Sequence, residues 1–315
     1  MIARWNTWRA GLAALCAGLA LAGCALEPVA PVTSPAPTPR AVPPVVSEES
    51  LEAAEFYARF QQRQLAAGLM RTDGGGPDTP YNARQLAENF ERIALFDEYT
   101  LRAGRFVAEQ SESRLRRWAG PVRVQAIFGP ATPPERKAQD SAALRDYTRR
   151  LARLTGADIR TGTGGGNYHV LFLNVDELRA AGPLLRELIP QIDDATLRDI
   201  TTLDRFTFCS VYAISTRAEP YTYTTAVAII RSEHPDLMRL SCIHEEIAQG
   251  LGLANDSPDA RPSIFNDDDE FALLTSHDER LLQMLYDPRL TPGLTPEEAR
   301  PLVRQIASEV MGGAS

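Results

Sequence analysis

The first 46 residues cannot contribute to a packed core, so the fold must be built from the residues that follow. Arg4 and Arg9 precede or border an uncharged run, residues 10–22, that is rich in Ala and Leu. This run is shorter than the roughly 20 apolar residues that a membrane-spanning helix needs. A basic start, a short apolar run and small residues at its end are typical of a secretory signal peptide. We therefore predict that residues 1–23 are a signal peptide.

The cysteine that follows this segment predicts a lipid anchor. Cys24 comes directly after Leu21-Ala22-Gly23. These four residues resemble the bacterial lipobox, which implies that Cys24 becomes the acylated first residue of the mature chain. In such lipoproteins the next residue influences sorting, and Ala25 in place of aspartate favours the outer membrane. We expect an envelope lipoprotein that faces the periplasm and reaches its membrane partner through Cys24.

A proline-rich segment separates the predicted anchor from the rest of the chain. Prolines recur from Glu27 to Val46, with Ala, Val, Ser and Thr between most of them. Such a segment is extended and semi-rigid and buries no core. We predict a linker at residues 24–47, one domain at 48–290 and a helical tail at 291–315, because the remaining length suits a single large domain.

The net charge limits the kinds of binding partner, and the cysteine content predicts a disulfide bond. The formal net charge is −8, and removing residues 1–23 with their two arginines leaves about −10, so nucleic acid is excluded as a partner. Of four cysteines, Cys16 leaves with the signal peptide and Cys24 carries the lipid. Cys209 and Cys242 remain, and an even pair in an oxidising compartment predicts a disulfide bond.

The pattern of apolar residues predicts an α/β or α+β body with a mixed sheet. Helices are expected at residues 47–70, from about 83 to 90, and at 141–154, 184–189, 195–200, 240–251 and from about 295. Strands are expected at residues 121–128, 170–175, 206–214 and 221–230. Ser47, Thr275 and Thr295 are predicted helix caps, and the glycine-rich run 162–166 is predicted to be a surface loop.

The segment after His244 carries the residue types of a catalytic site. A zinc-protease helix would need a second histidine four residues after His244, but that residue is Ala248. Shifted by one residue, the stretch Glu245-Glu246-Ile247-Ala248-Gln249-Gly250-Leu251-Gly252-Leu253-Ala254-Asn255-Asp256 resembles the metal-binding helix of metzincin metallopeptidases. This resemblance implies a zincin-like domain.

The resemblance assigns a role to individual residues. Glu245, Gln249 and Asn255 stand at the three ligand positions, and Glu246 stands at the position of the general base. Gly252 stands where the helix must end in a conformation that glycine tolerates best.

Two later segments extend the same resemblance. Ser263-Ile264-Phe265-Asn266 resembles the tight turn beneath the metal of these peptidases, with Phe265 in place of methionine. Leu274-Thr275-Ser276-His277-Asp278 resembles the start of their closing helix. The residues expected to line a ligand-binding cleft are therefore Glu245, Gln249, Asn255 and Phe265.

A second resemblance covers residues from about 80 to 290. This region, including Trp118-Ala119-Gly120-Pro121-Val122 and Asp287-Pro288-Arg289-Leu290, is similar to a bacterial family known as domain of unknown function 2927. This resemblance implies no particular activity.

The substitutions at the ligand positions argue against zinc catalysis. Catalytic zinc normally has three protein ligands, and the amide oxygens of Gln249 and Asn255 suit calcium or magnesium better than zinc. Without a firmly held cation, nothing lowers the pKa of the water that Glu246 would deprotonate. We expect no zinc-dependent peptide hydrolysis and favour no cofactor, with zinc and calcium as the metals to consider.

Three functions stay open. The first is a catalytically silent peptidase fold that binds a peptide or an envelope protein, and the second is a metal-dependent hydrolase with an unusual ligand set. The third is a structural or scaffold lipoprotein. Residues that offer metal ligands for the second are His244, Glu245 and His277, and then His234 and other carboxylates, which leaves His169 as the one further histidine of the mature chain. The acidic run 267–270 lacks calcium-loop spacing and is predicted to be a solvated turn.

Overall fold

The computed structural model describes residues 46–102, 105–162, 164–266 and 268–313, and their side chains except within residues 98–110. The predicted signal peptide, Cys24 and almost all of the proline-rich linker lie outside the described residues. Their assignment therefore stays a prediction. Within the described chain, no helix is both long and apolar enough to cross a membrane.

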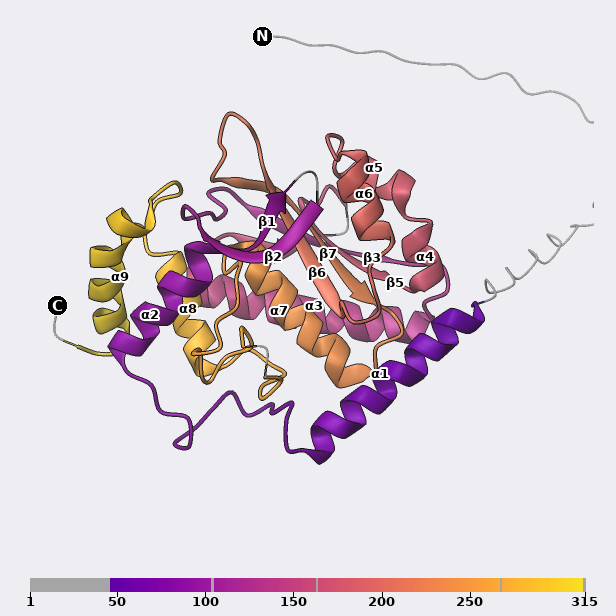
Figure 1. Cartoon of the computed structure of the whole chain (residues 1–315), viewed down its shortest axis with the longest axis horizontal. Coiled ribbons are helices and arrows are strands. Elements are labelled where there is room, and N and C mark those ends of the chain that lie inside the picture. The colour runs from indigo at the N-terminus through magenta and orange to yellow at the C-terminus, as the bar shows by residue number, and fades with distance from the viewer. Residues whose placement is uncertain (1–45, 103–104, 163, 267, 314–315) are drawn as a thin grey trace, which may run out of the picture. The chain divides into compact units, whose positions relative to one another are not determined.

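A mixed five-stranded sheet forms the centre of the domain (Figure 1). Its strands, in spatial order, are β4 (Ile159–Thr161), β3 (Val122–Phe128), β5 (Tyr168–Leu173), β7 (Tyr223–Arg231) and β6 (Cys209–Ser215). The first four run parallel to one another, whereas β6 is antiparallel to β7 and forms one edge of the sheet. The predicted α/β fold with a mixed sheet is confirmed.

Helices cover both faces of this sheet, and a separate two-stranded ribbon projects from it. The helices are α1 (Glu48–Ala66), α2 (Ala83–Ala94), α3 (Pro134–Thr155), α4 (Val175–Arg179), α5 (Gly182–Leu188), α6 (Asp194–Thr201), α7 (Asp236–Leu251), α8 (Ser276–Leu285) and α9 (Pro296–Val310). The ribbon pairs β1 (Phe96–Arg102) with β2 (Arg105–Glu112). Helices α4 to α6 lie on one side of the sheet, and α3 and α7 lie on the other.

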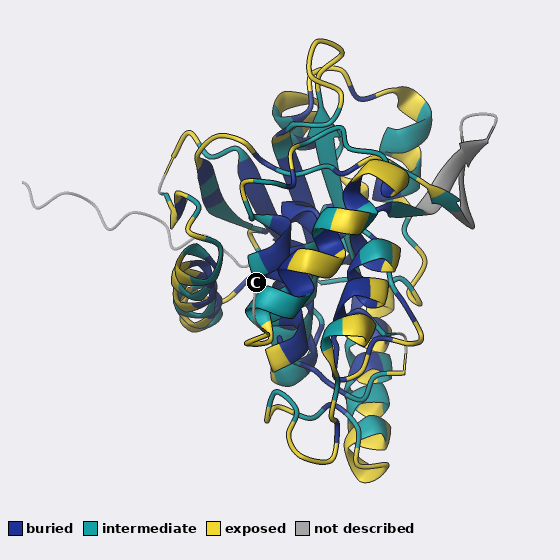
Figure 2. Ribbon diagram, turned by 90° about the vertical axis from the view of Figure 1, so that its left-hand side faces the viewer, coloured by how far each residue is buried: buried dark blue, intermediate teal, exposed yellow. Residues whose placement is uncertain are grey.

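The central strand shows how alternating residues build two cores. Every residue of β5 is buried, as expected for a parallel strand covered on both faces. Tyr168, Val170 and Phe172 face the core that contains α3 and α7, while Leu171 and Leu173 face the core under α4 to α6. Figure 2 shows buried strand residues at the centre of the domain and helices whose outer sides are exposed.

Several element ends match the sequence predictions and others differ. The side chains of Ser47, Thr275 and Thr295 each accept a hydrogen bond from a backbone N–H of the first turn, so these three caps are confirmed. The strand predicted at residues 170–175 ends earlier, because the Asn174 side chain caps the short helix α4 that follows. Strand β4 was not predicted.

The last helix is an integral part of the domain rather than an appended tail. Ala299, Val303 and Ile306 of α9 are fully buried in the same core as α7. Arg300 also pairs with Glu91 of α2 at 2.9 Å. The domain that we expected to end near residue 290 therefore continues through α9.

Hydrogen bonds from two aromatic side chains hold α7 close to the sheet. The Trp118 indole N–H donates to the Gly250 carbonyl at 2.8 Å, and the Tyr168 hydroxyl donates to the Glu246 carbonyl at 2.6 Å. A Cβ at Gly250 would lie 2.1 Å from that hydroxyl oxygen. Glycine at this position lets α7 approach the strand at contact distance.

We expect Gly250→Ala to destabilise the protein by about 1–3 kcal/mol because the added methyl group overpacks the core. Alanine would otherwise be the better helix former, by roughly 1 kcal/mol. Gly182→Ala is the matched control, since a Cβ there comes no nearer than 4.0 Å to the side chain of Leu197. Urea unfolding of both variants measures the difference, and a stabilised Gly250→Ala protein would contradict the close packing.

Candidate functional site

One face of α7 presents polar side chains toward the edge strand β6. Cys242, Glu245, Glu246 and Gln249 follow the i, i+3, i+4, i+7 spacing that places residues on one helical face. Carboxylate oxygens of Glu245 and Glu246 and the Sγ atom of Cys209 all lie within 4.8 Å of one another. We call Glu245, Glu246 and Gln249 the α7 polar row. Glu246 is 3% exposed, while the other two are half-buried.

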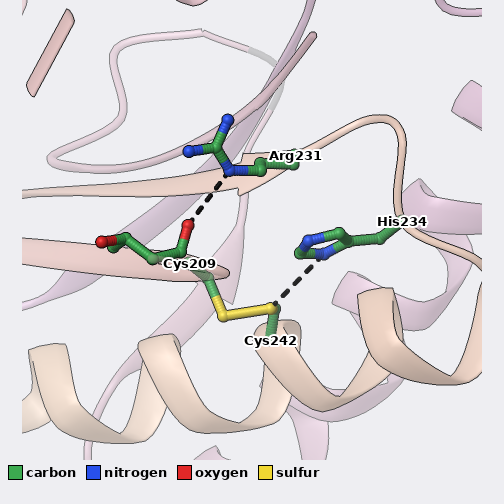
Figure 3. The surroundings of a disulfide bond; sticks show 5 residues. Cys209, Arg231, His234 and Cys242 are labelled. Atoms are coloured by element: carbon green, nitrogen blue, oxygen red, sulfur yellow. Dashed lines mark hydrogen bonds between the residues drawn. A yellow bond between two sulfur atoms is a disulfide. The ribbon is translucent and has the colours of Figure 1, made fainter. Parts of the chain in front are cut away.

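A disulfide bond fixes this face of α7 to β6 (Figure 3). Cys209 at the start of β6 is bonded to Cys242, with 5.9 Å between the Cα atoms. The predicted pairing is confirmed. The bond holds the α7 polar row beside the first residue of the edge strand.

Buried polar residues surround the disulfide. The Nδ1 atom of His234 lies 3.7 Å from the Cys242 sulfur, and burial holds the His234 pKa well below its usual value. The Tyr57 ring of α1 meets the imidazole edge-on, with 4.5 Å between centroids. Arg231 donates from Nε to the Thr207 carbonyl at 3.0 Å (Figure 3). His234 is thus packed against the disulfide rather than turned to the α7 polar row.

His244 lies on the opposite side of α7 from the polar row. Its Nδ1 atom accepts a hydrogen bond from the Leu274 N–H at 3.0 Å, and its ring stacks on Tyr147 with 4.0 Å between centroids. Burial, and to a smaller extent the charge of Arg150, lowers the His244 pKa to about 3. A neutral imidazole is therefore part of the packing between α7, α3 and the segment before α8.

The depressed pKa of His244 predicts an acid-sensitive stability. Between its ordinary pKa of 6.5 and the folded value of about 3, the unfolded chain binds a proton that the folded protein does not. Its stabilising contribution is complete above pH 6.5 and decreases as the pH falls toward 3. His244→Asn keeps an acceptor for the Leu274 N–H but does not titrate. Urea unfolding from about pH 6 to 4 should show a slope smaller than wild type by about 1.4 kcal/mol per pH unit. The same dependence of the unfolding free energy on pH in wild type and His244→Asn would contradict a lowered pKa of His244.

The other two histidines are also enclosed. His277 is fully buried in the first turn of α8, where its Nε2 atom lies 3.1 Å from the Asn89 side-chain nitrogen. The Tyr81 ring meets it edge-on. His169 lies within β5, is 7% exposed, and has a pKa lowered by burial. None of the four described histidines is in the group that Glu245 and Glu246 form with Cys209.

The remaining predicted site residues differ in accessibility. Gln249 is half-buried and donates from Nε2 to Asp256 at 3.4 Å. Asn255 is fully buried, and its side-chain amide donates to the Arg92 carbonyl at 2.8 Å. Phe265 is fully buried in the core around α7. Glu245 and Gln249 are therefore accessible to a ligand at the protein surface, whereas Asn255 and Phe265 are not.

Helix α7 ends at Gly252 as predicted, and the segment at residues 263–266 is hydrogen-bonded to α8. Gly252 ends α7 with a φ of +133°, and a Cβ there would come 2.4 Å from the Arg116 carbonyl oxygen. The carboxylate of Asp278, at the start of α8, accepts hydrogen bonds from the Ser263 hydroxyl and the Ile264 N–H. Asp278 thus ties the turn at residues 263–266 to α8, a role that we had not assigned to it.

The donor set at the α7 polar row does not fit catalytic zinc. The sulfur of Cys209 belongs to a disulfide, so it offers no thiolate. Among the described residues, the donors that remain in this group are then the two adjacent carboxylates of Glu245 and Glu246. Catalytic zinc sites normally provide three protein ligands, most often with imidazole among them. We therefore assign no step to a metal here.

Comparison with known proteins places the chain in a family but not in a functional class. No curated protein and no solved structure matches it. Residues 83–305, well over half of the chain, match the family described as "Protein of unknown function (DUF2927)". The match spans α2 to most of α9, including the sheet, the disulfide and the α7 polar row. The chain belongs to the DUF2927 family.

Proposed function

We propose that this protein is a lipid-anchored envelope protein that binds an extended peptide segment of a partner along β6, without cleaving it. The observation that carries the proposal is the position of the Glu245 and Glu246 carboxylates beside Cys209, the first residue of the edge strand. A lipobox at Cys24 and a proline-rich spacer would present this domain in the periplasm at the outer membrane.

The sheet edge supports backbone recognition. Among the described strands, β6 pairs with β7 alone and has no strand on its outer side. An exposed edge can accept an extended peptide as an additional strand through main-chain hydrogen bonds. A peptide at that edge would run next to the α7 polar row, because α7 is bonded to β6 through Cys242.

The charge of the row supports selection of a basic side chain. Carboxylate oxygens of Glu245 and Glu246 lie within 4.8 Å of each other, and Gln249 places the carboxylate of Asp256 beside them. Two neighbouring carboxylates repel each other and are stabilised by an added cation. Side chains of a bound strand alternate in direction, so one Lys or Arg of the peptide can reach Glu245.

The same residues support binding without hydrolysis. A metallopeptidase needs a metal ion that turns water into a nucleophile, which in metzincins is held by three histidines. Here the three corresponding positions are Glu245, Gln249 and Asn255, and the Asn255 amide already donates to the Arg92 carbonyl. A carboxylate at Glu246 alone does not supply that activation.

Two synthetic nine-residue peptides that differ only in a central Lys or Glu test the proposal. We expect the Lys peptide to bind about tenfold more tightly, as measured by isothermal titration calorimetry, and both peptides to stay intact. Glu245→Gln should remove most of that preference. Glu135→Gln is the control, since Glu135 is an exposed acid in the first turn of α3. Equal binding of both peptides, or an unchanged preference in Glu245→Gln, would contradict recognition by the α7 polar row.

A further inference from the structure

A hollow of about 400 Å³ lies between α1, α4 and the loop that follows α6, away from the α7 polar row. Val175, directly after the β5–α4 turn, and Arg231, the last residue of β7, both line it. In open α/β sheets the carboxyl ends of parallel strands are where ligands bind. The volume is also within the range of small-molecule sites. We call this space the α1–α4 hollow.

A buried cation lies at the base of the α1–α4 hollow. Arg231 is only 3% exposed, and its guanidinium donates to the carbonyl oxygens of Leu203, Asp204 and Thr207. Among the described residues, no carboxylate oxygen lies within 4.0 Å of it. Glu233 acts on it electrostatically, but Oε1 of Glu233 accepts from Ser50 and Val175 instead. A buried charge with no ion-pair partner attracts a counter-ion.

A second guanidinium stands at the rim. Arg205 is exposed, and its guanidinium carbon lies 5.1 Å from the centroid of Phe56 and 5.2 Å from that of Phe206. These two ring contacts limit its orientation. Arg179, also at the rim, is paired with both carboxylate oxygens of Glu49 at 2.6 Å.

The rest of the lining suits a ligand with an aliphatic part. Val175, Leu178 and Leu203 contribute apolar side chains. The lining carries three arginines and two glutamates, so its formal charge is about +1, which balances one negative charge rather than two. Guanidinium groups bind carboxylates with paired hydrogen bonds.

We propose that the α1–α4 hollow binds a small organic monocarboxylate. Its carboxylate lies between Arg231 and Arg205, and its aliphatic part packs against Leu178 and Leu203. One wall is α1, which precedes the family-matched residues 83–305, so this site depends on a helix that the family match does not include.

Calorimetric titration of the purified full chain with sodium hexanoate tests the site. Hexanamide serves as the uncharged probe of the same length, and inorganic phosphate as the anion without an aliphatic part. We expect saturable binding of hexanoate, with hexanamide and phosphate at least roughly tenfold weaker. Binding of phosphate with equal affinity would overturn the assigned ligand class, and binding of hexanamide with equal affinity would overturn the role of the arginines.

Three variants locate the binding and avoid Arg231, which holds three loop carbonyls. Arg205→Gln should weaken hexanoate binding about tenfold. Glu49→Gln releases Arg179 from its ion pair and should tighten binding several-fold. Arg198→Gln, an exposed substitution on α6 outside the hollow, should leave the affinity unchanged. No hexanoate binding by the wild type, or equal affinities in all variants, would overturn the proposal.

Discussion

Replacing both Cys209 and Cys242 with alanine is expected to lower the free energy of unfolding by about 4 kcal/mol. The bond closes a loop across 33 positions of sequence, and a cross-link of that span restricts the unfolded chain by about that amount. It also joins β6, which pairs with β7 along one side, to α7. We therefore expect a marked decrease in the urea midpoint and weaker binding of the Lys peptide, because β6 and the α7 polar row lose their fixed spacing.

Thiol chemistry provides the control for this prediction. Alkylation of the wild-type protein in denaturant without reductant should label neither Cys209 nor Cys242. Wild-type protein reduced before unfolding should then behave like the double alanine variant. Alkylation of both Cys209 and Cys242 without reductant, together with an unchanged urea midpoint in the double alanine variant, would show that the native protein lacks this disulfide bond.

Asp278→Ala is expected to be the most damaging single substitution of a polar residue, at about 3 kcal/mol or more. Asp278 is fully buried, and its carboxylate accepts from the backbone N–H groups of Ile264 and Thr275 at 3.1 and 2.9 Å. The Ser263 hydroxyl donates to the same carboxylate. Alanine would leave these donors buried without an acceptor and would remove half of the capping box of α8.

The neighbouring residue supplies a matched control. Glu279 stands in the same helical turn but is about a third exposed and pairs with Arg150 at 2.8 Å. Glu279→Ala should cost less than about 1 kcal/mol, because partly exposed ion pairs contribute little. Chemical unfolding of both variants at pH 7 gives the comparison. Similar losses in the two would indicate that Asp278 does not organise the turn.

The elements that the sequence predicted well are those whose apolar pattern is long and regular. Residues 121–128 alternate and form β3, residues 221–230 were expected to be extended and form β7, and Cys209 and Cys242 form the predicted disulfide. Strand β4 has only three residues, two of them exposed, so it carries no periodic signal. Helix α4 is five residues long and begins inside an apolar run that also suits a strand.

The candidate site was less predictable because its geometry depends on tertiary contacts. The sequence identified Glu245, Glu246 and Gln249, yet only the fold shows that they lie beside β6. His244 could have been assigned to the far face of α7 from the disulfide alone, since two residues along a helix turn the side chain by about 200°. The α1–α4 hollow could not be predicted from the sequence, because its lining comes from α1, α4, β7 and the loop after α6.

We propose that the α7 polar row binds a peptide without a catalytic metal, and the zinc content of the protein distinguishes this from a zinc enzyme. The purified full chain is incubated with excess zinc, dialysed against metal-free buffer and examined by elemental analysis, beside Glu245→Gln and Glu246→Gln variants. We predict far less than one zinc per chain in all three, with no difference among them. One zinc per chain in the wild type that is lost in either variant would contradict the account.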